Sequence, residues 1–470
     1  MANKTDILNN VEQIDVLATD VVGQLQAKTF PVRAIPGKTQ EERVASLLES
    51  TPTFDSSSLR GMNDIDQSDM TDPIDKDGII VKDPFRTIPT ALVFSDIREP
   101  ETIGGAPYHK DPRGVAKRAE AYLKSTGIGT TAYYGPEIEF FLFDSIRVKA
   151  DANRQILEYC SKEGAWTDEF HKVNNKLGYF PKGSWDKTTQ VRDKALKYLE
   201  EMGIEGEAHH HEVATAGQAE INMRFDSLVN MADKTQLYKY VVRKTAEEYG
   251  MTAVFLPKPL PNDNGSGMHT NMSIYKEDTN VFAGNIHGGL SIEGLWAVGG
   301  ILAHIGAISA FANPTTNSSR RFAKGFEAPI LAVYGARNRS AAIRIPSYHT
   351  SPKVKRLEAR FPDPMANPYL LNAAFLCAMV DGIQRKIDPG APMEHDVYEL
   401  GIGALRKLPA IPRSLDARLE TLYCDRKFLT ASGVFNDAII DSFIDKATGA
   451  AAEVDKYPSP REIEVYAGWN

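Results

Sequence analysis

The chain has 470 residues, 42% hydrophobic and 25% charged, which is typical of a globular protein with room for two or three domains. Its net charge of −8 argues against a nucleic-acid-binding protein, which usually presents a basic face. Three scattered cysteines without a CxxC pair, a polar N-terminus and the lack of an apolar run of about 18 residues exclude a disulfide framework, a secretory signal and a membrane span, and favour the cytoplasm.

The first stretch of the chain predicts a small β-rich domain over residues 1–105. Short β-like runs such as "IDVLATD" and "TALVFSDI" alternate with polar loops. Residues 54–78 are dense in Asp, Ser and Gly, which is typical of a loop rather than a core.

The remainder, residues 106–470, predicts an α+β domain with an antiparallel sheet. Helices are expected over 111–127, 186–203 and 235–250, because each ends on a glycine. Strands are expected over 131–144 and in "MTAVFLPKP", "NGSGMHTNMSIY", "AAIRIPS" and "KRLEARFPD". Residues 145–178 are polar and predict an irregular surface insertion. Strands and helices mix without a regular βαβ rhythm, which favours the α+β class.

Two strand-like segments carry charged residues on one face. In "GPEIEFF", Glu137 and Glu139 are two residues apart and therefore share a face. In "KRLEARFPD", Glu358 shares a face with Arg356 and Arg360. Adjacent carboxylates repel each other unless a cation or a proton compensates them. Taken singly, each pattern also fits a half-exposed strand.

The stretch "EAHHHEVATAGQAE" raises the question of a histidine metal site. The wider set of candidate ligands is rich in oxygen, which favours Mg²⁺ or Mn²⁺ over zinc. It consists of Glu137, Glu139, Glu212, Glu220, His269 and Glu358. Such hard cations usually serve phosphates, and the absence of HExxH further argues against a zinc hydrolase.

Residues suited to anions lie further along the chain. There is no Walker A motif or credible GxGxxG. In "NDNGSGMH", Gly265 and Gly267 allow close approach of backbone to a ligand, although a tight turn explains them equally well. Residues 313–346 are rich in arginine, which is typical of carboxylate or phosphate binding. These arginines are Arg320, Arg321, Arg337, Arg339 and Arg344.

These motifs together resemble class I (bacterial-type) glutamine synthetase over essentially the whole chain. The matching pieces include "DPRGVAKRAEAYL", "GPEIEFFLFD", "EAHHHEVATAGQAEI", "NDNGSGMHTNMS", "NPTTNSSRR" and "RLEARFPDPMANPYL". The resemblance implies a β-grasp domain (1–105) that closes the neighbouring subunit's site. It also implies a catalytic domain (106–470) with a curved antiparallel sheet flanked by helices, and a homo-dodecamer of two stacked hexameric rings.

The resemblance further implies ATP-dependent ligation of ammonia to L-glutamate through γ-glutamyl phosphate, with two or three Mg²⁺ or Mn²⁺ ions per site. The first metal would be held by Glu139, Glu212 and Glu220, and the second by Glu137, His269 and Glu358. Asp55, with Ser58, would bind and deprotonate ammonium, and Glu327 would close a flap over the intermediate.

Substrate contacts also follow from the resemblance. Glutamate and the transferring phosphate would meet Arg321, Arg339, Arg360, Asn264 and Gly265. The ATP contacts would be Glu207, Phe225, Asn271, Ser273, Arg344, Lys353 and Arg356.

The chain differs from the sequence usual in bacterial members of this family at Ser56, Met62, Asn271 and Lys324. These differences bear on nucleotide affinity and loop mobility rather than on the reaction itself. Tyr398, in "HDVYELG", resembles an adenylylated tyrosine, with an adenylyltransferase or PII-type regulator as implied partner. An ordinary loop tyrosine is the alternative.

Two other functions on this scaffold remain to be weighed. A γ-glutamyl ligase for a polyamine or another amine would tend to lose the ammonium-binding aspartate, so Asp55 favours ammonia. A non-catalytic structural relative would tend to lose metal ligands, and all six are present here. The three histidines, His209 to His211, are expected to be mostly structural, with His210 the nearest to the substrate pocket.

Overall fold

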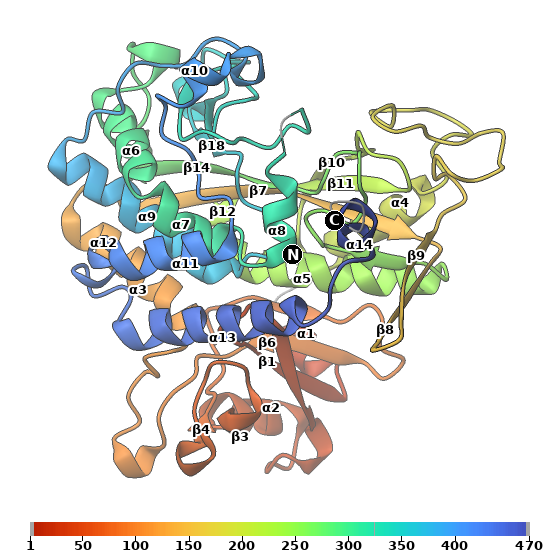
Figure 1. Ribbon diagram of the computed structural model, residues 1–470. Coiled ribbons are helices and arrows are strands. Elements are labelled where there is room, and N and C mark those ends of the chain that lie inside the picture. The colour runs from red at the N-terminus through yellow and green to blue at the C-terminus, as the bar shows by residue number, and fades with distance from the viewer. Residues whose placement is uncertain (1–3, 324, 467–470) are drawn as a thin grey trace.

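A small N-terminal β domain lies against a larger mixed domain in the computed structural model, which describes residues 4–323 and 325–466 (Figure 1). The small domain contains a four-stranded sheet in the order β2-β1-β6-β5, in which β1 and β6 are parallel. Its elements are α1 (Lys4–Asn9), β1 (Gln13–Thr19), β2 (Leu25–Pro31), α2 (Gln40–Glu49), β3 (Thr53–Asp55), β4 (Asp69–Thr71), β5 (Ile80–Lys82) and β6 (Thr90–Phe94).

The two central strands of this sheet, β1 and β6, are buried on both faces. Alternate residues of a strand point to opposite faces, so Val16 and Val93 pack into the domain's own core. Leu17 and Phe94, one residue further along, pack into the core of the large domain instead. The small domain is therefore joined to the large one through a shared hydrophobic core.

A buried ionic network crosses the same boundary. Arg113 donates to Asp233 of the large domain at 3.0 Å, and contacts Asp75 at 2.8 Å and Asp96 at 2.6 Å in the small one. Arg113 is 3% exposed, and removing one partner of such a buried network is costly. The network fixes how the small domain is set against the large one.

The large domain is built on a ten-stranded sheet whose main path runs β10-β11-β7-β14-β18-β17-β16. The prediction of an antiparallel sheet holds except between β16 and β17, which are parallel. The strands are β7 (Thr131–Phe143), β10 (Gly206–His211), β11 (Gln218–Met223), β12 (Asp226–Ser227), β13 (Thr252–Val254), β14 (Met268–Lys276), β15 (Thr279–Asn280), β16 (Tyr334–Ala336), β17 (Ile343–Ile345) and β18 (Leu357–Ala359).

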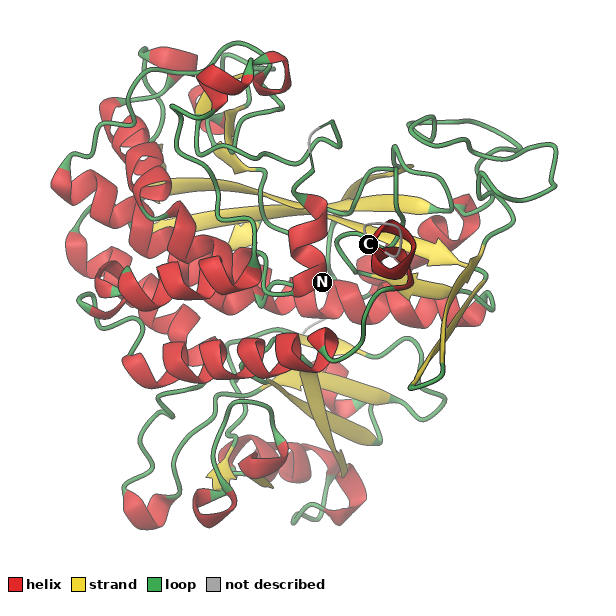
Figure 2. Cartoon of the chain, viewed as in Figure 1, coloured by secondary structure: helices red, strands yellow, loops and turns green. Residues whose placement is uncertain are grey.

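Helices cover one side of this sheet, while loops and short elements lie toward its other side, near the top of the view (Figure 2). The helices are α3 (Pro112–Thr126), α4 (Thr189–Glu201), α5 (Leu228–Glu248), α6 (Ile292–Ala303), α7 (Ile305–Ala312), α8 (Thr316–Arg321), α9 (Pro368–Arg385), α10 (Ile402–Leu405), α11 (Leu415–Cys424), α12 (Lys427–Thr430), α13 (Asp437–Asp455) and α14 (Pro460–Tyr466). The helix expected from residue 235 begins at Leu228, because the buried face continues through Leu228, Met231 and Ala232.

The prediction of an irregular segment over 145–178 is wrong for its first half. Residues Ser145–Asp151 (β8) and Arg154–Cys160 (β9) form an antiparallel hairpin. Most of its side chains are exposed on both faces, so the sequence shows no strong burial pattern there. The rest of the segment is loop, as expected.

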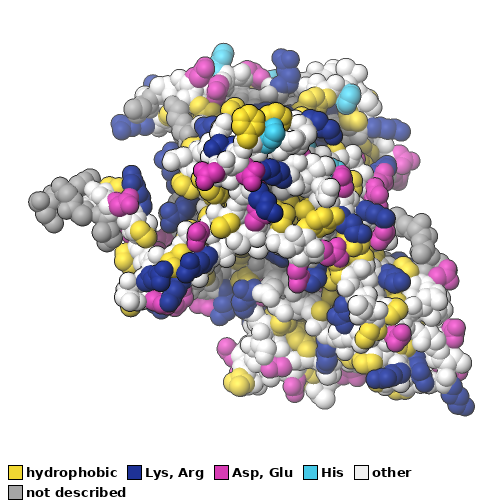
Figure 3. Space-filling model, turned by 90° about the vertical axis from the view of Figure 1, so that its right-hand side faces the viewer, with side chains coloured by type: hydrophobic (Ala, Val, Ile, Leu, Met, Phe, Trp, Pro, Cys, Tyr) yellow, Lys and Arg dark blue, Asp and Glu magenta, His cyan; other side chains and the backbone are white. Residues whose placement is uncertain are grey.

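The surface carries mixed charge. On the face drawn in Figure 3, Lys and Arg side chains are interspersed with Asp and Glu rather than gathered in one basic patch. Among the described residues, no single helix has both the length and the apolar character needed to cross a membrane.

Candidate active site

The six predicted metal ligands come from four neighbouring strands and the loop that joins β10 to β11. Glu220 of β11 lies opposite Glu139 of β7, and Glu137 of β7 lies opposite His269 of β14. Glu358 of β18 lies opposite Asn271, two residues beyond His269. Directly opposed side chains share a face and lie close together. The strand register therefore gathers the ligands on one face of the sheet.

One cluster contains Glu137, His269 and Glu358, whose ligand atoms lie within 4.8 Å of one another. Nδ1 of His269 is 3.5 Å from Oε2 of Glu137. Burial, with the nearby Arg360 guanidinium, holds the pKa of His269 well below its usual range. The imidazole is therefore neutral, which is the form that binds a metal.

The second cluster differs in one member from the predicted set. Glu212 and Glu220 lie together as expected, but the third group within 4.8 Å is His210 rather than Glu139. Glu139 lines the same cavity, and its Oε2 accepts hydrogen bonds from Gly267 N at 2.9 Å and from Gln218 Nε2 at 3.1 Å. His210 is thus a further candidate ligand, whereas the sequence predicted a mostly structural role for it.

The electrostatics of these carboxylates favour a bound cation. Burial, followed by repulsion from Glu139, raises the pKa of Glu212 well above its usual range. Burial and the charges of Glu137 and Glu212 do the same to Glu220. Buried carboxylates this close require either protons or positive charge. An oxygen-rich donor set with one histidine fits Mg²⁺ or Mn²⁺.

The other two histidines of the triplet hold the segment in place. His211 is 1% exposed and bonds Glu163 through Nε2 at 3.0 Å and the Gly178 carbonyl through Nδ1 at 2.8 Å. His209 contacts Asp193 at 2.8 Å. These contacts agree with the structural role expected for both residues.

A cavity of about 290 Å³ lies beside the two clusters of candidate metal ligands. Six of the seven predicted ATP contacts line it, namely Glu207, Phe225, Asn271, Ser273, Lys353 and Arg356. The seventh, Arg344, lines a cavity of about 620 Å³, which is also lined by most of the candidate metal ligands. Both cavities share Glu137, Asn222 and Arg356, so the cavity that contains the predicted ATP contacts adjoins the one that contains the candidate metal ligands.

Asn271 connects these two cavities. Its side chain donates to Glu137 at 3.0 Å and to the Gly135 carbonyl at 3.2 Å. Its carbonyl oxygen accepts from Nε of Arg356 at 2.8 Å. The amide therefore orients both a metal ligand and an arginine of the nucleotide cavity.

The arginines make contacts that the sequence did not predict. Arg344 and Arg360 both form ion pairs with the fully buried Glu358. Arg321 donates to the backbone carbonyls of Phe361 at 2.8 Å and Arg360 at 3.1 Å. Nη2 of Arg360 is buried and has no hydrogen-bond partner among the residues that the structure describes. An unpaired buried guanidinium nitrogen at the metal cavity suits an anionic ligand oxygen.

A small cavity of about 20 Å³ adjoins the metal site and brings together several predicted glutamate contacts. Asn264, Gly265, Arg321 and Glu327 line it. Gly265 is a glycine because a Cβ there would lie 2.2 Å from the Pro257 carbonyl oxygen. The close approach is thus between two segments of the chain, rather than only between backbone and ligand.

Asp55 and Ser58 are not brought to these cavities. They lie in the β-grasp domain, at the opposite end of the molecule from β10, β11 and β14 (Figure 1). Asp55 is exposed and accepts hydrogen bonds from Ser57 and Ser58 of its own loop. The hydrogen bonds from Ser57 lower the pKa of Asp55, so this carboxylate is charged at neutral pH.

Several site residues were missed by the sequence analysis. Tyr133 and Tyr275 line the nucleotide cavity, and Tyr133 packs edge-on against Phe225 at 5.3 Å. Tyr133 lies on β7 at the same period-two spacing as Glu137, a signal that could have identified it. Tyr348 accepts hydrogen bonds from Arg339 at 3.3 Å and Arg344 at 3.2 Å, and no local motif marks it. The departure at Lys324 lies outside the described residues.

Comparison with known proteins agrees with this geometry. A family model described as the glutamine synthetase catalytic domain matches residues 109–466, and one for the glutamine synthetase β-grasp domain matches residues 10–100. The glutamine synthetase of Aquifex aeolicus is 46% identical over 460 residues, covering 97% of this chain and 96% of that protein. That of Escherichia coli is 43% identical over 466 residues, covering 97% of both. A solved Plasmodium falciparum glutamine synthetase has a TM-score of 0.89 at 26% identity, over 99% of both chains.

A β-grasp domain joined to a sheet that carries two carboxylate-rich clusters beside a nucleotide-sized cavity defines an ATP- and metal-dependent ligase. The matches over nearly the whole length make the assignment specific. The chain belongs to the glutamine synthetase family, in its class I, bacterial-type branch. It is a glutamate–ammonia ligase that synthesises glutamine at the expense of ATP.

Proposed function

We propose that the reaction proceeds through γ-glutamyl phosphate in a site completed by two subunits. The carrying observation is the continuity of three cavities: the nucleotide cavity opens onto the metal cavity, which adjoins the small cavity lined by Asn264 and Arg321. This order supports ATP and glutamate approaching the metal clusters from opposite sides. The ligand sets proposed are Glu139, Glu212 and Glu220 for one ion, and Glu137, His269 and Glu358 for the other.

The chain's own residues position the transfer. Asn271 and Arg356 orient the phosphates, while Arg339, Arg344 and Arg360 supply positive charge around the transferring group. When held by these ligands, Mg²⁺ or Mn²⁺ would supply positive charge that neutralises phosphate oxygens. The product of this step is an acyl phosphate that water destroys, so Glu327, which lines both the metal and the glutamate cavities, serves as the closing group.

Ammonia then attacks the γ-carbonyl carbon of the acyl phosphate, the bond from that carbon to the phosphate oxygen breaks, and inorganic phosphate leaves as glutamine forms. Ammonium first loses a proton, and a charged carboxylate is a suitable base. Asp55 is the proposed base, and its exposed position far from its own chain's metal site favours action in the site of a neighbouring subunit. A cavity of about 530 Å³ lined by Glu327, Arg339 and Tyr398 is a suitable entry for that loop. A site shared between subunits fits the proposed homo-dodecamer, in which residues 1–105 of one chain would close the site formed by residues 106–470 of its neighbour. We propose that this enzyme acts in the cytoplasm.

A complementation experiment tests the shared site. Asp55→Asn and Glu220→Gln are each expected to abolish glutamine synthesis. The two variants are then co-expressed in equal amounts, each with a different affinity tag. About a quarter of the sites are expected to be active, because random mixing pairs an intact Asp55 with an intact metal site at that frequency. Doubly tagged assemblies that remain inactive would place Asp55 in its own chain's site or outside catalysis.

A further inference from the structure

The short segment Gly325–Ala328 carries Glu327 in a strained conformation. The φ angle of Glu327 is +57°, in the left-handed region that residues other than glycine rarely adopt. Such a conformation persists only where surrounding contacts hold it. The contacts that hold this segment are therefore part of how Glu327 is positioned.

Phe326 lies between two ammonium groups. Nζ of Lys176 and Nζ of Lys258 are each 4.2 Å from the centroid of its ring. Both distances fall within the roughly 6 Å over which a cation is attracted to an aromatic ring. Lys176 also donates to the Gly325 carbonyl at 3.0 Å. The segment is thus held through both its backbone and its one aromatic side chain.

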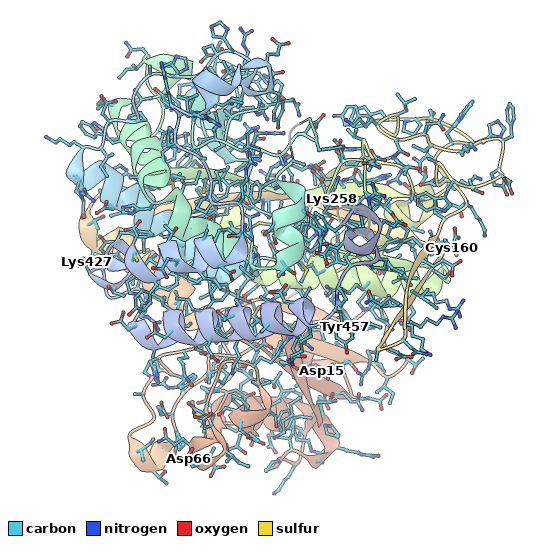
Figure 4. The ribbon with its side chains drawn as sticks, in the orientation of Figure 1. Asp15, Asp66, Cys160, Lys258, Lys427 and Tyr457 are labelled. Atoms are coloured by element: carbon cyan, nitrogen blue, oxygen red, sulfur yellow. The ribbon has the colours of Figure 1, made fainter. Side chains whose placement is uncertain are left out.

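The two lysines are themselves fixed by the large domain. The buried carboxylate of Asp263 accepts hydrogen bonds from the backbone of Lys176 at 3.0 Å and of Asn264 at 2.9 Å. The ammonium group of Lys258 donates to the backbone carbonyl of Asp263. The backbone N–H of Lys258 donates to the side-chain oxygen of Asn317, in α8, at 2.7 Å. Figure 4 places Lys258 beside α8, within the large domain. Asp263 therefore holds the Lys258 ammonium group, the backbone of Lys176 and the backbone of Asn264, which lines the glutamate cavity.

We propose that Lys176, Phe326 and Lys258 form a cation–π latch that holds Glu327 closed over the acyl phosphate. The inference rests on the proposed γ-glutamyl phosphate route. The three residues act as positioning residues, because their contacts join them to the segment that carries Glu327, although Lys176 and Phe326 also line the metal and glutamate cavities. When the latch fails, water cleaves the acyl phosphate to glutamate and inorganic phosphate, and ATP is consumed without formation of glutamine.

The test measures the ratio of phosphate released to glutamine formed, with ATP, glutamate and ammonium all saturating. Phe326→Leu keeps an apolar side chain but removes the ring, and is expected to raise this ratio severalfold. Phe326→Tyr keeps the ring and is expected to leave the ratio near that of the unmodified protein. A Phe326→Leu protein with an unchanged ratio would overturn the latch.

Variants of the two lysines test the latch independently if the Phe326→Leu protein does not fold. Lys258→Gln is expected to raise the ratio, and Lys258→Arg, which keeps the charge, to restore it. Lys176→Gln is expected to behave like Lys258→Gln, while Lys182→Gln, an exposed lysine in the same loop, serves as the control. Equal ratios in Lys258→Gln and Lys258→Arg would exclude a role for the cation. Absence of glutamine formation by the unmodified protein would instead contradict the underlying reaction.

Discussion

Tyr398 donates a hydrogen bond of 2.8 Å from its phenolic hydroxyl to the backbone carbonyl of Ala328, the residue that follows Glu327. Burial raises the pKa of this phenol to about 12, so the hydroxyl keeps its proton at neutral pH and remains a donor. The segment proposed to close the site is thereby tied to the tyrosine that resembles an adenylylated residue. A nucleotidyl group on this oxygen would remove the donor and release the segment.

Tyr398→Phe removes this hydrogen bond while keeping the ring. Loss of one neutral hydrogen bond costs about 0.5–1.5 kcal/mol, which corresponds to roughly a 2- to 12-fold effect. We expect the KM for glutamate to rise by about that factor while the KM for ATP stays unchanged, because Ala328 adjoins the glutamate side of the site. Steady-state kinetics with each substrate varied in turn provides the measurement. Equal changes in both constants would assign Tyr398 a general structural role.

The two candidate ligand sets around Glu212 and Glu220 can be separated by titration with Mn²⁺. A hard cation prefers carboxylate oxygen over imidazole nitrogen, so Glu139→Gln is expected to weaken binding by about tenfold or more. His210→Gln is expected to weaken binding less than Glu139→Gln does, because the proposed ligand set contains Glu139 and not His210. Isothermal titration calorimetry of each full-length variant decides the matter. The reverse order of effects would make His210 the third ligand.

Much of the site could be predicted because its ligands lie on strands. The period-two spacing of Glu137 and Glu139 identified the face of β7 that carries the candidate metal ligands, and the structure brings Glu220 opposite Glu139 and His269 opposite Glu137. What the sequence could not give is the direction of long side chains. The ion pair of Arg344 with Glu358 depends on strand pairing between β17 and β18, which no local pattern reveals, whereas Arg360 lies two residues from Glu358 and shares its face by local spacing.

The fold shows the same division. The helix over 111–127 was predictable, since Asp111 caps it, Pro112 begins it and Gly127 ends it with a φ of +70°. The β8–β9 hairpin was not, because an exposed ribbon buries little apolar surface and so leaves no clear alternation in the sequence. Asp55 could be singled out only by resemblance, since its expected site lies on another copy of the chain.

Asn271 offers a test of the link between nucleotide and metal. Asn271→Ala removes hydrogen bonds to Arg356 and Glu137 and leaves these charged groups to reorient. We expect the KM for ATP to rise about tenfold, equivalent to about 1.4 kcal/mol, because hydrogen bonds to charged groups are worth about 1.5–3 kcal/mol. The KM for glutamate should change little. Initial-rate kinetics at saturating metal checks this, and a rise confined to the metal requirement would place Asn271 with the ligands alone.

His304 provides a prediction about stability and pH. It lies between α6 and α7, with Nδ1 2.8 Å from Asp425 and Nε2 3.0 Å from Asp381. Burial alone would lower the pKa of His304, but the hydrogen bonds and charges of Asp425 and Asp381 outweigh it and raise the pKa above its usual value. A raised pKa means that the folded state binds the proton more tightly than the unfolded state. The resulting stabilisation is complete below the unfolded pKa of about 6.5 and is lost as pH rises through the folded pKa.

His304→Gln is therefore expected to destabilise the protein more at about pH 6 than at about pH 9. The stacking of His304 on Phe428, with ring centroids 3.9 Å apart, is lost at both pH values and supplies the pH-independent part of the effect. Thermal unfolding at fixed protein concentration and scan rate gives the comparison, since assembly affects the midpoint. Phe428→Leu is the matched control, because it removes the stacking but keeps both ion pairs, and its effect should not depend on pH. An equal loss for His304→Gln at both pH values would show that the two carboxylates do not hold a charged imidazole.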